Sequence, residues 1–94
     1  MRKSAKLYDM VESVENKRKR LIYRAWHRGT REMDMILGRF ADAHIGDMNE
    51  SALAQFDALL KENDPDIYNW LTQRETPPAN VRSSVLEQLI QSQP

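Results

Sequence analysis

The hydrophobic positions of this chain recur at three- and four-residue steps, the spacing of one face of an α-helix. From Glu15 onward the residues are strong helix formers, and neither glycine nor proline interrupts them before Gly29. This pattern predicts a first helix that begins at Glu15 and ends just before Gly29. Its apolar side is formed by Leu21, Ile22, Ala25 and Trp26.

Two further helices follow from the same spacing. The second is predicted to begin with Thr30 as its N-cap and to run to about Ile45. The third is capped by Asn49 or Ser51 and ends at Asn63. Their apolar sides are formed by Met33, Ile36, Leu37 and Phe40 in the second helix and by Leu53, Phe56, Leu59 and Leu60 in the third.

Prolines mark the beginnings of the last two predicted helices. The sequence Asp64-Pro65-Asp66 supplies an N-cap side chain, a tolerated proline and a first-turn acid. Thr76-Pro77-Pro78 breaks the chain again and opens a last helix. No segment predicts a strand, and short connections favour antiparallel neighbours. We therefore expect an all-α fold, a compact five-helix antiparallel bundle, as a single domain over residues 15–94. Residues 1–14 are predicted to be a flexible or loosely docked N-terminal lead-in.

Size and composition exclude several classes of function. A chain of 94 residues supports a modest core, which argues against a buried cofactor site. Without cysteine it has no disulfide, thiolate metal site or thiol nucleophile. No apolar run is long enough to cross a bilayer, and no hydrophobic export segment follows the first charges. We therefore expect a cytoplasmic protein without membrane contact, monomeric when free.

Residues that could support catalysis do not occur in suitable patterns. The two histidines, His27 and His44, lack a second ligand at metal-binding spacing. The three glycines are scattered and form no nucleotide-binding loop. Glu32 and Asp34 point roughly 160° apart on a helix, which argues against a paired-carboxylate enzyme. The sequence predicts no enzyme, no metal and no independently bound cofactor.

The charge is unevenly distributed along the chain. Residues 1–31 carry ten Lys or Arg against three acids, a net +7, and residues 32–94 carry a net −7. A basic stripe is predicted on the first helix, facing solvent or a partner. Three interpretations remain open for it: a solvated face, a protein-docking surface, or a nucleic-acid-binding regulator, against which the neutral total charge argues. The stripe consists of Lys17, Arg20, Arg24, His27 and Arg28.

The turn between the first two helices is the strongest candidate site. Gly29 is suited to a left-handed backbone just past a helix end, and Glu32 is favoured in the first turn of the next helix. Ordinary helix-end chemistry selects the same residues. A contact surface is nevertheless favoured, because helical geometry puts a methionine and a small residue among cations on the outer face of the second helix. That outer face comprises Arg31, Met35, Gly38 and Arg39, while Trp26 and Trp70 are predicted core anchors.

An ordered set of short motifs resembles the FAD assembly factor SdhE family, also called the succinate dehydrogenase assembly factor 2 family. The resemblance covers most of the chain. His27 departs from it, since many members carry Arg or Lys there. The motifs are Arg20-Leu21, Arg28-Gly29-x-x-Glu32-x-Asp34, Leu37 and Phe40, Leu59-Leu60, Asp64-Pro65-Asp66-Ile67-Tyr68-Asn69-Trp70-Leu71, and a proline-opened last helix.

The resemblance implies an assembly factor, or chaperone, that binds the flavoprotein subunit of succinate dehydrogenase, and in some members of fumarate reductase. Such a protein promotes protein flavinylation, the covalent attachment of FAD, with the attacking histidine and the FAD both belonging to the partner. An antitoxin-like interaction protein is a further alternative. The resemblance implies partner-binding roles for Arg28, Gly29, Glu32 and Asp34, and helix geometry adds Arg20, Arg24, His27, Arg31 and Met35.

Overall fold

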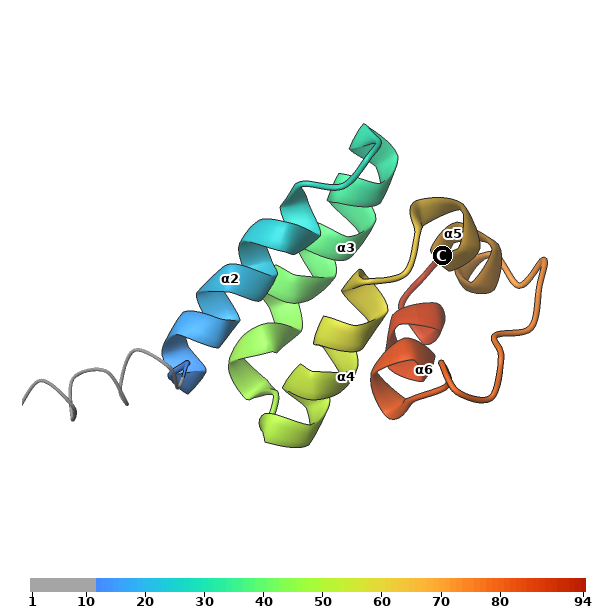
Figure 1. Ribbon diagram of the computed structural model, residues 1–94. Coiled ribbons are helices and arrows are strands. Elements are labelled where there is room, and N and C mark those ends of the chain that lie inside the picture. Colours follow the sequence, from blue (N-terminus) through green and yellow to red (C-terminus); the bar gives the residue numbers. More distant parts are fainter. Residues whose placement is uncertain (1–11) are drawn as a thin grey trace, which may run out of the picture.

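The computed structural model of the protein describes residues 12–94 (Figure 1). Within that range the chain forms five α-helices and one 3-10 turn, and no strand, which confirms the predicted all-α fold. Most of the predicted lead-in, residues 1–11, lies outside the described residues. The elements are α2 (Val14–Trp26), α3 (Arg31–His44), η1 (Ile45–Asp47), α4 (Glu50–Leu60), α5 (Asp64–Leu71) and α6 (Ser84–Gln91).

Each of the five α-helices within residues 12–94 begins at a side-chain N-cap that accepts a hydrogen bond from a backbone N–H three residues further on. The predicted caps Thr30 and Asn49 are confirmed. Three predicted boundaries are wrong. Helix α2 ends at Trp26 and not just before Gly29, so Arg28 lies beyond the helix. Asn63 does not end α4; it caps α5, so Asp64 is the first residue of that helix and its carboxylate is free for other partners. The last helix begins after Ser83, whose hydroxyl caps it, and not at the prolines.

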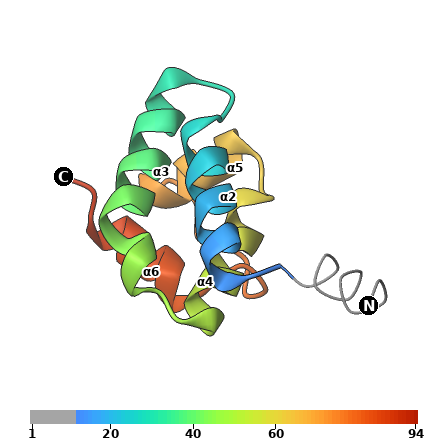
Figure 2. The same cartoon turned by 90° about the vertical axis from the view of Figure 1, so that its left-hand side faces the viewer.

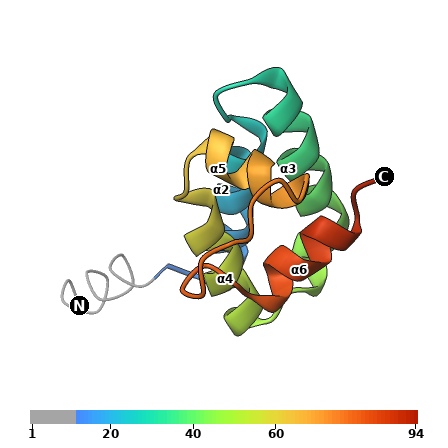
Figure 3. The same ribbon diagram turned by 90° about the vertical axis from the view of Figure 1, so that its right-hand side faces the viewer.

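Helices α2, α3 and α4 run up, down and up beside one another (Figures 1 and 2). Helix α2 contacts both α3 and α4, and α6 packs against α4 and α5 on the other side of the molecule (Figure 3). Each helix turns its apolar side inward, so one core joins all five. Its largest fully buried side chains are Phe56, Leu21, Leu37, Leu53, Ile67, Leu86 and Leu89.

The two tryptophans occupy different environments. Trp70 is 5% exposed and lies in the core, as predicted. Trp26 is half-buried and packs outside the core on Gly38 of α3, so its prediction as a core anchor is wrong. Gly38 itself is buried beneath the indole and does not share the outer face of α3 with Arg39, which corrects a second prediction.

The helices of the described residues are short and polar on one side. None of those between residues 12 and 94 combines the length and the apolar character needed to cross a bilayer.

Candidate functional site

The side chain of Arg28 attaches the turn between α2 and α3 to the connection between α4 and α5. The guanidinium Nε donates to Asp64 Oδ1 at 2.8 Å, Nη1 to the Leu60 carbonyl at 2.7 Å and Nη2 to the Glu62 carbonyl at 2.9 Å. The side chain is 10% exposed. The prediction that Arg28 faces solvent or a partner as part of the basic stripe is therefore wrong. Its guanidinium instead binds the α4–α5 connection, because three acceptors lie together there.

Gly29 is attached to the same carboxylate. Its backbone N–H donates to Asp64 Oδ2 at 2.8 Å, and a Cβ at this position would lie 3.1 Å from that oxygen. Gly29 does not have the positive φ that the sequence predicts. Glycine suits the position because it lets the Asp64 carboxylate approach the backbone closely, not because the turn is left-handed.

The other side of the turn is held by the first turn of α3. The Arg28 backbone N–H donates to the Asp34 carboxylate, and the Thr30 hydroxyl accepts from the Met33 N–H at 3.2 Å. Glu32 lies between these two anchored positions. Its side chain is exposed and takes part in no hydrogen bond or ion pair within residues 12–94, so this carboxylate is available to a partner.

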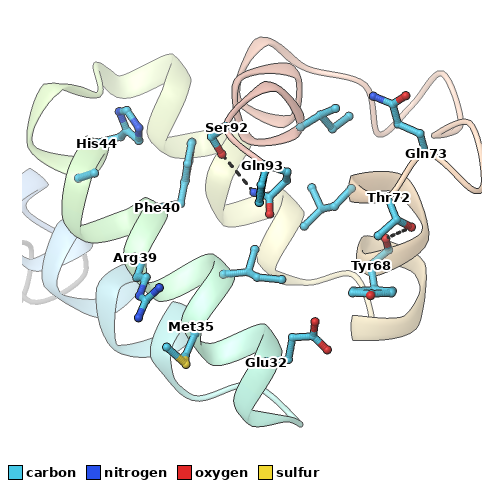
Figure 4. A pocket seen from close by; sticks show the side chains of 15 residues that line it. Glu32, Met35, Arg39, Phe40, His44, Tyr68, Thr72, Gln73, Ser92 and Gln93 are labelled. Atoms are coloured by element: carbon cyan, nitrogen blue, oxygen red, sulfur yellow. Dashed lines mark hydrogen bonds between the residues drawn. The ribbon is translucent and has the colours of Figure 1, made fainter.

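A groove with a volume of about 950 Å³ begins beside Glu32 and runs along α3 (Figure 4). Glu32 and Arg39 supply charge on its α3 wall, and Met35 lies on the same wall. Residues from α5 and the C-terminal segment form the opposite wall. The groove is lined by Glu32, Met35, Ile36, Arg39, Phe40, Ala43, His44, Tyr68, Leu71, Thr72, Gln73, Ile90, Ser92, Gln93 and Pro94.

Two other arginines of the predicted stripe, Arg20 and Arg24, pair with an acid of α4. Asp57 accepts from Arg24 at 2.9 Å and from Arg20 at 3.4 Å, while Arg20 also binds Glu12 at 2.8 Å. Burial raises the pKa of Asp57, but hydrogen bonds from Arg24 and Arg20 outweigh it, and the net pKa is lowered. The hydrogen bond from Arg20 likewise lowers the pKa of Glu12.

These pairings weaken the nucleic-acid interpretation of the stripe, because neutralised cations contribute little to phosphate binding. His27 is exposed and stacks on Tyr23, with ring centroids 3.9 Å apart. Arg31 is also exposed, next to the capped start of α3. The structure therefore divides the predicted site residues: Glu32 and Met35 share the groove, whereas Arg20 and Arg24 lie on the α2–α4 side.

Several structurally important residues were not predicted as part of the site. Asp64 holds both Arg28 and Gly29, and Asp57 holds two arginines of α2. Arg18 donates to the carbonyls of Ile45 and Met48 and ties α2 to the end of α3. For Asp57 and Asp64 the sequence shows only an acidic residue on an amphipathic helix, and this does not indicate which basic residue each one binds.

The groups gathered at the site are suited to recognition. Within residues 12–94 no cluster of three or more histidine or acidic side chains is placed to hold a metal. The groups on offer are one free carboxylate, one guanidinium, a thioether and an anchored backbone turn. Such groups recognise a partner surface through charge and shape.

Comparison with known proteins gives a consistent result. Residues 19–93 match the family described as flavinator of succinate dehydrogenase. The protein named succinate dehydrogenase assembly factor 2, mitochondrial, of Dictyostelium discoideum is 35% identical over 82 residues, covering 87% of this chain and 58% of that protein. Proteins of the same name from Candida glabrata and Arabidopsis thaliana are 43% and 35% identical, with 83% and 86% of this chain and 54% and 45% of those proteins covered.

The chain thus spans about half the length of these three relatives. Their names describe assembly factors, in agreement with the prediction that the protein is not an enzyme. The names also call them mitochondrial, and the predicted cytoplasmic location is therefore wrong. That prediction depended on the lack of an apolar export segment, a feature that mitochondrial targeting does not use.

Proposed function

The chain belongs to the family of succinate dehydrogenase flavinators, and from this membership we propose that it binds the flavoprotein subunit and promotes covalent attachment of FAD to it. In this proposal the reacting histidine and the FAD belong to the flavoprotein. The small protein contributes a docking surface and binds no cofactor of its own.

The observation that carries the proposal is the state of Glu32. Three neighbouring residues of the turn are engaged, Arg28 with Asp64, Gly29 with Asp64 and Thr30 with Met33, while Arg31 is exposed. Glu32 alone keeps an exposed carboxylate, at the N-terminus of α3 and at the mouth of the groove. Because the backbone that carries Glu32 is already fixed by these contacts, only its side chain has to be ordered when a partner binds it.

The groove extends this surface along α3. Glu32 and Arg39 are seven residues apart, a separation of about 10 Å along a helix, with Met35 between them. A complementary flavoprotein segment would present a basic group to Glu32, an apolar side chain to Met35 and an acidic group to Arg39. Opposite charges at a fixed spacing select both the partner and its orientation.

Promotion of flavinylation needs no catalytic group on this chain. A docked protein that favours the attachment-competent arrangement of the flavoprotein shifts its population toward that arrangement. Because the flavin and the histidine then meet in the correct geometry more often, the bond forms faster.

The test is a flavinylation assay with the apo flavoprotein subunit and FAD. After a denaturing gel only covalently bound flavin fluoresces with the subunit. We expect the wild-type protein to raise this signal and Glu32→Ala to abolish the increase while remaining folded. Glu50→Ala is the matched control, since Glu50 is also an exposed first-turn acid, at the start of α4.

Two results would contradict the proposal. If the wild type neither raises the signal nor binds the flavoprotein, the function is wrong. If Glu32→Ala and Glu50→Ala stimulate as well as the wild type, the docking surface lies elsewhere. Gly29→Arg adds a third variant, which we expect to lose stimulation because the Asp64 carboxylate, 3.1 Å from an added Cβ, would have to shift.

A further inference from the structure

We propose that Asp64 of α5 is a positioning residue, which fixes the α2–α3 turn in the conformation that docks the flavoprotein without itself contacting that partner. This inference depends on the proposed function and assigns a role to a helix outside the turn motif. It rests on the contacts of one carboxylate with two adjacent residues.

The two oxygens of Asp64 serve two different donors. Oδ1 accepts from the Arg28 side chain at 2.8 Å, and Oδ2 accepts from the Gly29 backbone N–H at 2.8 Å. One carboxylate thus restrains a side chain and the next peptide unit simultaneously. Since a carboxylate has acceptors only, no other side chain of similar size fits both donors.

The position of Asp64 is itself well defined. Asn63 takes the N-cap of α5, accepting from the Asp66 N–H at 2.9 Å, so Asp64 does not have to cap its own helix. Its side chain is 15% exposed and lies against Arg28, which also donates to the carbonyls of Leu60, the last residue of α4, and of Glu62. The turn is therefore fastened to the rigid α4–α5 connection.

This attachment determines where the docking groups lie. The Arg28 and Gly29 amides are bound by Asp34 and Asp64, and Thr30 caps α3 immediately afterwards. These contacts therefore also fix the position of the Glu32 backbone, two residues after Thr30. Loss of the Asp64 contacts would let the turn sample other conformations. Binding of a partner would then carry the additional entropy cost of ordering the turn.

A second ion pair provides the comparison. Asp57 of α4 pairs with two arginines of α2, and its side chain is 19% exposed, close to the 15% of Asp64. Asp57 touches no part of the turn. If Asp64 only stabilised the bundle, loss of either charge would affect docking equally.

The experiment compares Asp64→Asn with Asp57→Asn and Asp66→Asn. An asparagine is isosteric but has one acceptor oxygen, so whichever way it turns, its NH₂ meets a donor. Asp66→Asn removes the same charge from the same first turn, and Asp66 makes no side-chain hydrogen bond within residues 12–94. Stimulation of flavinylation is titrated with each protein at a temperature where circular dichroism shows all of them fully folded.

We expect Asp64→Asn to raise the concentration for half-maximal stimulation on the order of tenfold, as for one lost charge-assisted bond, with an unchanged plateau. Asp57→Asn and Asp66→Asn should match the wild type. Asp64→Glu, which keeps two acceptors on a longer side chain, should need a concentration between those of the wild type and Asp64→Asn. If Asp64→Asn fails to fold, a curve for Asp64→Glu equal to that of the wild type would overturn the proposal. Equal titration curves for Asp64→Asn and Asp57→Asn would overturn the proposal.

Amide hydrogen exchange followed by NMR separates this inference from the proposed function. In Asp64→Asn the Gly29 amide should exchange faster while the amides of α4 stay protected. An unchanged Gly29 rate would overturn the positioning role whatever the flavinylation assay gives. If the wild type fails to stimulate while Gly29 responds as expected, the proposed function is wrong and the docking role of Asp64 is overturned with it, although the attachment itself is real.

Discussion

Gly38 of α3 lies directly against the indole of Trp26 from α2. A Cβ built on Gly38 would be 2.2 Å from the Trp26 Cδ2 atom and 2.4 Å from Cε2. The indole Nε1 donates to Asp42 at 3.2 Å, one turn further along α3. The absent side chain thus makes room for a large one from the neighbouring helix, and this contact joins the two helices that flank the turn.

Gly38→Ala should therefore destabilise the protein even though alanine favours helices. Alanine gains about 1 kcal/mol of helix propensity over glycine. Displacing the indole costs about 1 to 3 kcal/mol, since overpacking moves side chains from their preferred positions. We expect a net loss in the free energy of unfolding, measured by urea denaturation, and a changed emission spectrum from Trp26. Gly46→Ala is the control, because nothing lies within 4 Å of an added Cβ there; a stability gain in both variants would contradict the packing argument.

Asp57 should make the free energy of unfolding depend on pH in the acidic range. Its pKa lies below the ordinary 3.8, because hydrogen bonds from Arg24 and Arg20 outweigh the effect of burial. A lowered pKa stabilises the folded state above pH 3.8, and this contribution is lost as the pH falls through the lower value. Asp57→Asn should cost about 1 to 2 kcal/mol at pH 7. Urea unfolding at several pH values should show this difference shrinking below about pH 4. Asp47→Asn is the control, since Asp47 is an exposed acid without an ion pair within residues 12–94. Its free energy of unfolding should stay close to that of the wild type at all of these pH values.

The end of α5 carries an unusual backbone conformation that gives a third prediction. Gln73 directly follows the C-cap of the helix and has φ 62°. Its N–H donates to the Trp70 carbonyl, and the N–H of the next residue, Arg74, donates to the Asn69 carbonyl. This is a Schellman arrangement, in which glycine is preferred at the left-handed position. Gln73→Gly should raise the melting temperature, with a gain of about 0.5 to 1 kcal/mol. Gln73→Ala is the matched control, since it removes the side chain but keeps the Cβ; equal gains from both variants would mean that side-chain loss is the cause.

The helices could be predicted from the sequence because helix formation is a local property. Periodicity located all five, and side-chain chemistry identified the caps Thr30 and Asn49. The misplaced start of α6 has a local reason as well. Prolines 77 and 78 are permitted at a helix start, but a serine hydroxyl can bond a free N–H directly, and Ser83 does so with Leu86.

The contacts of the charged residues could not be predicted in the same way. Helical geometry places Arg24 and Arg28 on one face, but nothing local indicates that Asp57 and Asp64, more than thirty residues away, take up their charges. The role of Gly29 was missed for the same reason. The sequence indicates a glycine at a turn, and only the fold shows that the close neighbour is a carboxylate.

The groove leads to a final prediction about Arg39. Its guanidinium is exposed on the α3 wall and takes part in no ion pair within residues 12–94, so reversing its charge should leave the free energy of unfolding within about 0.5 kcal/mol. Arg39→Glu should nevertheless weaken binding to the flavoprotein subunit on the order of tenfold, because an acidic partner group would then face a like charge.

The measurement is the dissociation constant of the complex at two salt concentrations. Lys19→Glu is the matched control, since it changes the net charge equally at an exposed position of α2 outside the groove. The effect at Arg39 should be larger than at Lys19 and should fall as salt screens the charges. If both variants weaken binding equally, only the overall charge of the protein matters, and the groove along α3 is not where the flavoprotein docks.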